Sequence, residues 1–141
     1  MRLISYFSGI NLYIMKNTLL LLLLFAGLSL TDEANAQTLL SPDAFEKMLK
    51  NDPNIQLVDV RTPEEFSDGH IQKAVNYDYY AADFAQKIVQ LDKTKPVLVY
   101  CEAGARSASS AEKLKKAGFK KIYDLDGGMS AWREAGKKVV N

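Results

Sequence analysis

Short apolar runs alternate with amphipathic segments along most of the chain, and this alternation is the main indication of the fold. Five runs are rich in residues that favour buried strands. They cover residues 38–40, 55–60, 74–77, 97–100 and 121–125. Helical spacing of apolar residues is found within 42–50, 63–69, 81–91, 107–117 and 129–135. Strands and helices that alternate in this way predict an α/β fold, with a central parallel sheet and helices on both faces.

Two of the predicted helices begin with clear capping signals. Ser41 precedes Pro42, which fits an N-cap followed by proline at the first helical position. Thr62 and Glu65 have the spacing of a capping box. Gly118 suits the left-handed position that often follows the end of a helix.

The sharpest change of pattern follows the strand at 97–100. Cys101, the only cysteine, comes directly after this strand, and Ser107 opens an alanine- and lysine-rich helix. In parallel sheets, ligands bind beyond the carboxyl ends of the strands. A helix N-terminus nearby favours a thiolate, and Gly104 allows the loop to turn its N–H groups inwards. We interpret Cys101 as a reactive thiolate in a loop that suits an anion, with a buried, inert thiol as the alternative.

The loop after Cys101 is predicted to bind the substrate. Arg106 carries a permanent charge suited to an anionic group, and we favour this role over an ion pair with a helix carboxylate. The residues before it contribute mainly through backbone N–H groups, so their conformation matters more than their side chains. With Cys101 as the catalytic residue, the predicted substrate-binding residues are Glu102, Ala103, Gly104, Ala105, Arg106 and Ser107.

Several other polar and aromatic residues are interpreted as structural. Asp59 and Arg61 are expected to brace the sheet edge and the helix that follows Thr62. His70, the only histidine, has no partner motif and is not assigned as a general base. Packing rather than ligand binding is expected of the aromatic residues Tyr77, Tyr79, Tyr80 and Trp132.

Composition narrows the classes of function. The chain has 141 residues, 48% hydrophobic and 25% charged, as in a soluble globular protein with one domain. A net charge of +1 gives no electrostatic reason to expect nucleic acid or an anionic membrane as partner. One cysteine cannot form an internal disulfide or a dithiol redox pair, and with one histidine it cannot form a zinc site. Composition leaves the oligomeric state open.

Residues 1–36 have the pattern of a secretory signal peptide. An apolar core at 18–30 follows Lys16 and precedes an A-x-A site at 34–36. The core is shorter than the roughly 20 apolar residues of a membrane span, and an uncleaved anchor is the alternative. Met15 competes with Met1 as the start, and the absence of a cysteine near the cleavage site excludes a lipoprotein. We expect cleavage, a mature domain at 37–141 that is periplasmic or secreted, and no membrane contact after cleavage.

Four segments of the predicted mature chain resemble the rhodanese family, in that family's order and approximate spacing. They are LVDVRTPEEF at 57–66, GHI at 69–71, YCEAGARS at 100–107 and DLDGGMSAW at 124–132. The resemblance implies one rhodanese domain with a central parallel sheet. It also implies that Cys101 accepts a sulfane sulfur from a small anionic donor such as thiosulfate, as a persulfide, and passes it to a thiol or to cyanide. Neither a metal nor an organic cofactor is implied.

The chain departs from the family pattern at two places. Gln72 and Lys73 stand where the family often has proline and glycine, and we expect this to alter only the local turn. Glu102 is acidic where thiosulfate-using relatives often have a neutral or basic residue, which bears on the choice of donor.

Two other functions compete with sulfur transfer. The first is a phosphatase of the same architecture, but the loop of the resembling dual-specificity phosphatases is one residue longer. Here only four residues separate Cys101 from Arg106, which favours the smaller sulfur atom over a tetrahedral phosphate. The second is a binding module that has kept the fold and lost the chemistry, and the presence of both Cys101 and Arg106 speaks against it.

Overall fold

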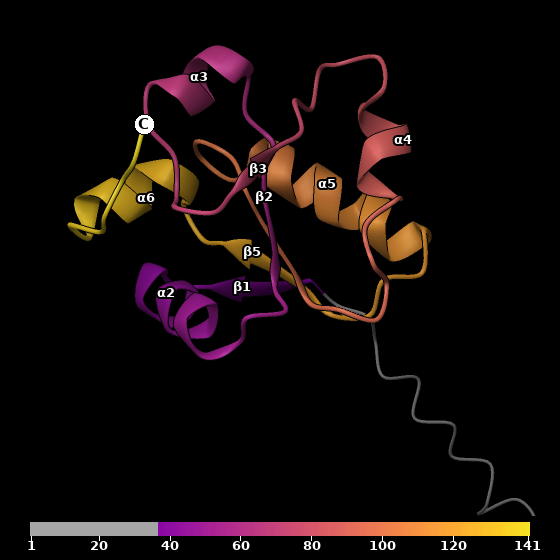
Figure 1. Ribbon diagram of the computed structural model, residues 1–141, viewed down its shortest axis with the longest axis horizontal. Coiled ribbons are helices and arrows are strands. Elements are labelled where there is room, and N and C mark those ends of the chain that lie inside the picture. Colours follow the sequence, from indigo (N-terminus) through magenta and orange to yellow (C-terminus); the bar gives the residue numbers. More distant parts are fainter. Residues whose placement is uncertain (1–36) are drawn as a thin grey trace, which may run out of the picture. The chain divides into compact units, whose positions relative to one another are not determined.

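A five-stranded parallel sheet forms the centre of residues 37–141, the part of the chain that the computed structural model describes. The strands are β1 (Thr38–Leu40), β2 (Gln56–Asp59), β3 (Val75–Asn76), β4 (Val97–Tyr100) and β5 (Ile122–Leu125). Their order in space is β1-β5-β4-β2-β3, and every neighbouring pair is parallel. The predicted α/β fold with a central parallel sheet is confirmed (Figure 1).

Helices cover both faces of this sheet. They are α2 (Pro42–Asn51), α3 (Pro63–Ser67), α4 (Phe84–Ile88), α5 (Ala105–Lys116) and α6 (Gly128–Glu134). On one face, Ile88 of α4 and Leu114 of α5 join a buried cluster. On the other face, Phe45 of α2 and Trp132 of α6 join a second cluster, and Figure 1 shows the two helix pairs on opposite sides of the strands. Successive residues of β4 alternate between the clusters, so this strand is buried on both faces.

The predicted capping signals are present. The Ser41 hydroxyl accepts a hydrogen bond from the N–H of Ala44 at 3.4 Å. The Thr62 hydroxyl accepts from the N–H of Glu65 at 3.3 Å, and the Glu65 carboxylate accepts from the N–H of Thr62 at 2.9 Å. Gly118 follows the end of α5 with a φ of +95°. The capping box orients Glu65 at the start of α3, which matters for the site below.

The helix predicted at 81–91 is shorter in the structure. α4 covers only Phe84–Ile88. Before it, the N–H of Ala81 donates to the carbonyl of Asp78 at 3.0 Å, which forms a turn. The Asp78 carboxylate also accepts from the N–H of Tyr80 at 2.9 Å. Such local bonds to a side chain compete with helix formation and explain the later start.

The helix predicted to open at Ser107 begins two residues earlier. α5 starts at Ala105, directly after Gly104, whose φ is +105°. A left-handed conformation is favourable for glycine, so the chain turns from the loop into the helix at this position. The earlier start places Arg106 in the first turn of α5.

The turn at 71–74 keeps a backbone shape that favours glycine. The N–H of Ala74 donates to the carbonyl of Ile71 at 3.0 Å and closes the turn. Lys73 has a φ of +72° and is the only non-glycine residue with a positive φ among residues 37–141. A left-handed conformation costs a residue with a Cβ atom about 1–2 kcal/mol. The departure from the family pattern at this turn therefore leaves local strain.

Residues 37–141 contain no helix that is long and apolar enough to cross a membrane. The same residues include no group of three or more His, Cys, Asp or Glu side chains placed to hold a metal ion. Residues 1–36, on which the predictions of a leader and of export depend, lie outside the described part of the chain.

Candidate active site

Cys101 lies at the carboxyl end of β4, the middle strand of the sheet, and only 1% of its surface is exposed. The neighbouring strands place two carboxylates at the same edge. Asp59 of β2 pairs in register with Tyr100, and Asp124 of β5 pairs with Val99. Both aspartates are buried. The carboxyl edge thus combines a thiol with polar side chains that need partners inside the protein.

Two groups of the cysteine loop (residues 101–107) contact the sulfur atom. The N–H of Gly104 donates to Cys101 Sγ at 3.1 Å. Ser107 Oγ accepts a hydrogen bond from the Cys101 thiol at 3.5 Å and donates its own proton to the carbonyl of Gly104 at 3.0 Å. The N–H aimed at sulfur stabilises negative charge on it, and the Ser107 hydroxyl lies within reach of the same atom. Of the six predicted substrate-binding residues, the structure brings Gly104 and Ser107 to the sulfur, while Ala103 and Ala105 are exposed.

The start of α6 fixes the backbone of this loop. The N–H of Met129 donates to the carbonyl of Cys101 at 2.9 Å, and the N–H of Ser130 donates to the carbonyl of Glu102 at 3.1 Å. Gly128 packs so closely against the loop that a Cβ atom there would overlap the carbonyl oxygen of Cys101. Gly128 of the DLDGG segment therefore permits the contact between the loop and α6.

Arg106 is bound by a carboxylate. Its two terminal nitrogens donate to the two oxygens of Glu65 at 2.7 and 2.8 Å, and its guanidinium lies 5.8 Å from the ring centre of Tyr80. Hydrogen bonds from Arg106 lower the pKa of Glu65 from 4.5 to about 2. Sequence reasoning preferred an anion contact, whereas the structure has the alternative ion pair. The capping box places Glu65 at the start of α3 and the early start of α5 places Arg106 in its first turn, and the tertiary packing of the two helices brings the side chains together.

The side chain of Glu102 connects the loop to three other groups. It accepts hydrogen bonds from Arg61 at 3.2 Å, from the Ser130 hydroxyl at 3.1 Å and from Arg133 at 2.7 Å. Sequence reasoning gave its backbone more weight than its side chain. In the structure the carboxylate ties the residue after the cysteine to the β2 edge and to α6.

Asp59 and Arg61 form a buried ion pair beside the loop. The Arg61 guanidinium donates to both Asp59 oxygens, with its shortest contact at 2.7 Å, and to the carbonyl of Gly69 at 2.8 Å. Burial lowers the pKa of Arg61, but hydrogen bonding to Asp59 and its charge outweigh this and raise the pKa overall. Both side chains are at most 1% exposed, and the contact with Gly69 ties the end of β2 to the residues after α3, in agreement with the predicted bracing role.

Residues 41–135 match the family of the rhodanese-like domain. The chain belongs to this family. The thiosulfate sulfurtransferase GlpE of Shewanella oneidensis is 40% identical over 82 residues, which are 58% of this chain and 79% of that protein. A rhodanese-related protein of Thermoplasma volcanium has a TM-score of 0.65 and 28% identity, covering 74% of this chain and 98% of that one. The polysulfide-sulfur transferase homodimer of Wolinella succinogenes has a TM-score of 0.63 and 33% identity. The match covers 77% of this chain and 80% of that one.

The histidine and most large aromatic residues of this rhodanese domain are structural, as predicted. The His70 ring stacks on Phe66 with ring centres 3.8 Å apart. Trp132 is buried and its indole N–H donates to the carbonyl of Lys138 at 3.0 Å. Tyr77 and Tyr79 pack against the cluster on the α4 and α5 face. Tyr80 is 69% exposed and packs at the surface, where its ring lies edge-on to Tyr79 with ring centres 5.5 Å apart.

Sequence reasoning did not single out Asp124 as a residue near the site. It is 1% exposed, and one of its oxygens accepts a hydrogen bond from the Gln37 side chain. The other, Oδ1, has no geometrically aligned partner among residues 37–141. Burial raises the pKa of Asp124 from 3.8 to about 6, and hydrogen bonding to Ser107 and Gln37 limits the rise. The only signal in the sequence is one acidic residue inside an apolar strand.

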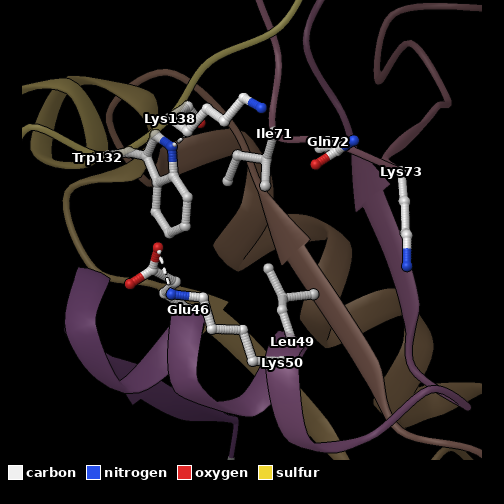
Figure 2. A pocket seen from close by; sticks show the side chains of 8 residues that line it. All are labelled: Glu46, Leu49, Lys50, Ile71, Gln72, Lys73, Trp132 and Lys138. Carbon is white, nitrogen blue, oxygen red and sulfur yellow. Dashed lines mark hydrogen bonds and ion pairs between the residues drawn. The ribbon is translucent and has the colours of Figure 1, made fainter.

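Hollows on the surface of the rhodanese domain include one beside the cysteine loop and one beside α2. One, of about 350 Å³, borders the cysteine loop at Ala103 and Gly104 and reaches Asp124 at the end of β5. The other, of about 290 Å³, lies between α2, the turn with Lys73 and the indole of Trp132 (Figure 2). The first hollow adjoins the candidate site, whereas no residue of the cysteine loop lines the second.

Proposed function

We propose that this rhodanese domain is a sulfurtransferase that carries sulfane sulfur as a persulfide on Cys101. The donor is a small anion such as thiosulfate, and the acceptor is a thiol or cyanide. The observation that carries the proposal is the position of Sγ, with the N–H of Gly104 at 3.1 Å and the Ser107 hydroxyl at 3.5 Å. The N–H stabilises negative charge on the thiolate and on a persulfide, and the Ser107 hydroxyl does the same once its proton turns from the Gly104 carbonyl to the sulfur. The names of the Shewanella and Wolinella relatives support this reaction class.

The reaction proceeds by two displacements at sulfur. The Cys101 thiolate attacks the outer sulfur of thiosulfate, so a new S–S bond forms, the S–S bond of the donor breaks, and sulfite leaves with its electron pair. The acceptor then attacks the terminal sulfur of the persulfide and releases the Cys101 thiolate. With cyanide the product is thiocyanate. The sulfur atom moves between two nucleophiles, so no outside oxidant or reductant is needed.

Within this proposal, the loop residues have different roles. Gly104 and Ser107 hold the reacting sulfur, and the exposed backbone at Ala103 and Ala105 forms the entrance for the donor. Glu102 and Arg106 act mainly by fixing the ends of the loop, because their charges are already paired. This assigns the two charged residues a smaller part in donor binding than their charges alone indicate.

The arrangement gives less support to phosphatase activity. A phosphatase of this architecture needs its arginine to hold the phosphoryl oxygens, whereas both terminal nitrogens of Arg106 are occupied by Glu65. We expect the full-length chain to convert thiosulfate and cyanide to thiocyanate and sulfite, and to hydrolyse aryl phosphates at a negligible rate. Cys101→Ser should abolish thiocyanate formation. Aryl phosphate hydrolysis at a rate comparable to sulfur transfer would contradict the proposal.

We further propose that residues 1–36 are a signal peptide, and that the mature domain begins at Gln37 outside the cytoplasm. The proposal depends on the order of three features in the sequence, which are a basic residue, an apolar core and an A-x-A site. Expression of the full-length chain in a host with a periplasm, followed by intact-mass measurement of the periplasmic fraction, tests it. The expected product begins at Gln37, and a cell-associated product that keeps residues 1–36 would contradict cleavage.

A further inference from the structure

Asp124 is a buried carboxylate whose hydrogen bonding is incomplete. It lies at the carboxyl end of β5, beside the strand that ends at Cys101. Its side chain takes one hydrogen bond from Gln37, and Oδ1 has no aligned donor among residues 37–141. A buried oxygen without a donor costs free energy that nearby groups normally remove. The arrangement therefore needs an explanation beyond packing.

Besides the Gln37 amide and the backbone N–H of Leu125, the group that interacts with the Asp124 carboxylate is the Ser107 hydroxyl. Ser107 Oγ donates to the carbonyl of Gly104 at 3.0 Å, lies 3.5 Å from Cys101 Sγ, and is close enough to Asp124 to limit the rise of that residue's pKa. A hydroxyl has a single proton to donate but can also accept. The Cys101 thiol donates to Ser107 Oγ, but a Cys101 thiolate is an acceptor, and it then competes with the Gly104 carbonyl and the Asp124 carboxylate for the one Ser107 proton.

We propose that Asp124 is a positioning residue that directs the Ser107 hydroxyl and thereby makes the reactivity of Cys101 depend on pH. An ionised Asp124 draws the Ser107 proton to Oδ1 and away from Sγ. A neutral Asp124 donates its own proton to Ser107 Oγ, and the Ser107 proton is then free to point at Sγ. The inference rests on the proposed role of Cys101 as a nucleophile.

The charges around Asp124 are compatible with such a switch. Asp126, at the end of the same strand, raises the pKa of Asp124 further. On the β1 side, residues 38–40 carry no charge and Gln37 contributes a neutral amide. On the α5 side, Arg106 is bound to Glu65. Among residues 37–141, no cation forms an ion pair with Asp124, so its charge state is set by burial and by these hydrogen bonds.

The test is the pH dependence of the alkylation rate of Cys101 by iodoacetamide, followed by intact mass on the full-length chain. Because the chain has one cysteine, the readout reports Cys101 alone. The wild-type profile should contain a step near pH 6, where Asp124 titrates, besides the ionisation of the thiol. Asp124→Asn should remove this step and speed alkylation at pH 7.5 by roughly three- to tenfold, the change that about half to one pKa unit produces.

Two further variants separate this mechanism from a structural or a purely Coulombic role. Asp126→Asn removes a neighbouring exposed charge and should keep the step. In a Ser107→Ala background, the effect of Asp124→Asn should shrink severalfold. An unchanged effect in that background would overturn transmission through the hydroxyl. A profile of Asp124→Asn that matches the wild type would overturn the proposal as a whole.

Gln37→Leu keeps the proposal testable even if Asp124→Asn does not fold. The hydrogen bond from Gln37 lowers the pKa of Asp124, so its loss should move the step to higher pH. A step that stays in place would contradict the assignment to Asp124. Alkylation is measured without a sulfur donor, so a failure of thiosulfate to load Cys101 would count against the proposed function and leave this result standing.

Discussion

Two arginines hold the cysteine loop, and their surroundings differ. Arg61 is 1% exposed and contacts Asp59 and Glu102, so it links the β2 edge to the residue after the cysteine. The Arg106 side chain is 17% exposed and Glu65 is 31% exposed, so this pair links α5 to α3 nearer to the solvent. Both guanidinium groups are occupied by carboxylates of the same chain. The difference lies in burial and not in the chemistry of the pair.

This difference predicts where each arginine matters. A buried ion pair that loses one partner leaves an uncompensated charge in a poorly solvated place, so stability suffers most. A pair near the surface is solvated when it is broken, so the effect on stability is small and the effect on local geometry is greater. Arg61 should therefore contribute mainly to stability, whereas Arg106 should mainly adjust the shape of the loop.

The largest expected effect is that of Arg61→Ala. Removing this guanidinium leaves Asp59 buried without its ionic partner, which should lower the free energy of unfolding by about 3–5 kcal/mol. Urea denaturation of the full-length chain measures this. Arg133→Ala is the matched control, because Arg133 binds the same Glu102 but is 42% exposed, and it should cost less than about 1 kcal/mol. Equal losses in the two variants would contradict the comparison.

Glu102→Gln should have the next largest effect. Sequence reasoning alone expects turnover to stay the same or to improve, because a negative charge beside Cys101 is removed. The structure predicts a decrease, because Glu102 accepts from Arg61, Ser130 and Arg133. We expect a loss of about 1–3 kcal/mol in unfolding free energy together with slower thiocyanate formation. Faster turnover of Glu102→Gln than of the wild type at low salt would contradict this and would support repulsion of the donor by the Glu102 charge.

Arg106→Ala should reduce sulfur transfer with a cost of only about 1 kcal/mol in stability, since the pair is partly solvated. Glu65→Gln separates bracing from donor attraction. If Arg106 braces the loop, weakening its partner should lower turnover of thiosulfate as well. If the guanidinium instead attracts the donor, Glu65→Gln should raise turnover by freeing its charge. Steady-state kinetics of both variants at two ionic strengths distinguish these results.

The same pair should contribute to stability in a defined pH range. Because the pKa of Glu65 is lowered from 4.5 to about 2, the stabilisation from its charged form is present above pH 4.5 and is lost as the pH falls towards 2. Arg106→Ala should therefore lose less stability than the wild type between pH 4.5 and pH 2. Thermal melting at pH 6 and at pH 3 measures the difference, and equal acid sensitivity of the two proteins would contradict it.

The smallest effect is expected far from both arginines. Lys73→Gly should relieve the strain of a φ of +72° and stabilise the fold by up to about 1 kcal/mol, after the greater freedom of glycine in the unfolded chain is counted. Turnover should stay unchanged, because no residue of the cysteine loop lines the hollow beside Lys73. Gln72→Gly is the control and should destabilise. Loss of turnover in Lys73→Gly would show that the two regions are coupled.

Local signals were sufficient to predict the fold. Alternating strand and helix patterns predicted the parallel sheet, and short-range capping residues such as Thr62 and Glu65 predicted helix starts, because these interactions span only a few residues. The predicted end of the strand at 97–100 likewise agrees with the structure, in which Cys101 directly follows β4. The predicted helix bounds were wrong at α4, which starts later, and at α5, which starts earlier. Both differences have local causes, in the turn at Asp78 and in the left-handed backbone of Gly104.

The partners of the charged residues could not be predicted in the same way. The contacts of Arg106 with Glu65 and of Arg61 with Glu102 each join residues 41 positions apart, and that of Glu102 with Arg133 spans 31 positions. Such pairs depend on how α3, α5 and α6 meet around the sheet, which periodicity does not encode. A charge near a cysteine was therefore interpreted as a ligand for the substrate, although tertiary contacts had already supplied its partner.

The most direct test of the proposed function is the intact mass of the full-length protein after treatment with thiosulfate. We predict a gain of one sulfur atom, its removal by cyanide, and no gain in Cys101→Ser, because the chain has no other cysteine. Polysulfide serves as a second donor in the same measurement, so that a preference between donors is separated from a lack of chemistry. A wild-type mass that changes with neither donor would contradict a persulfide on Cys101 and favour a binding module.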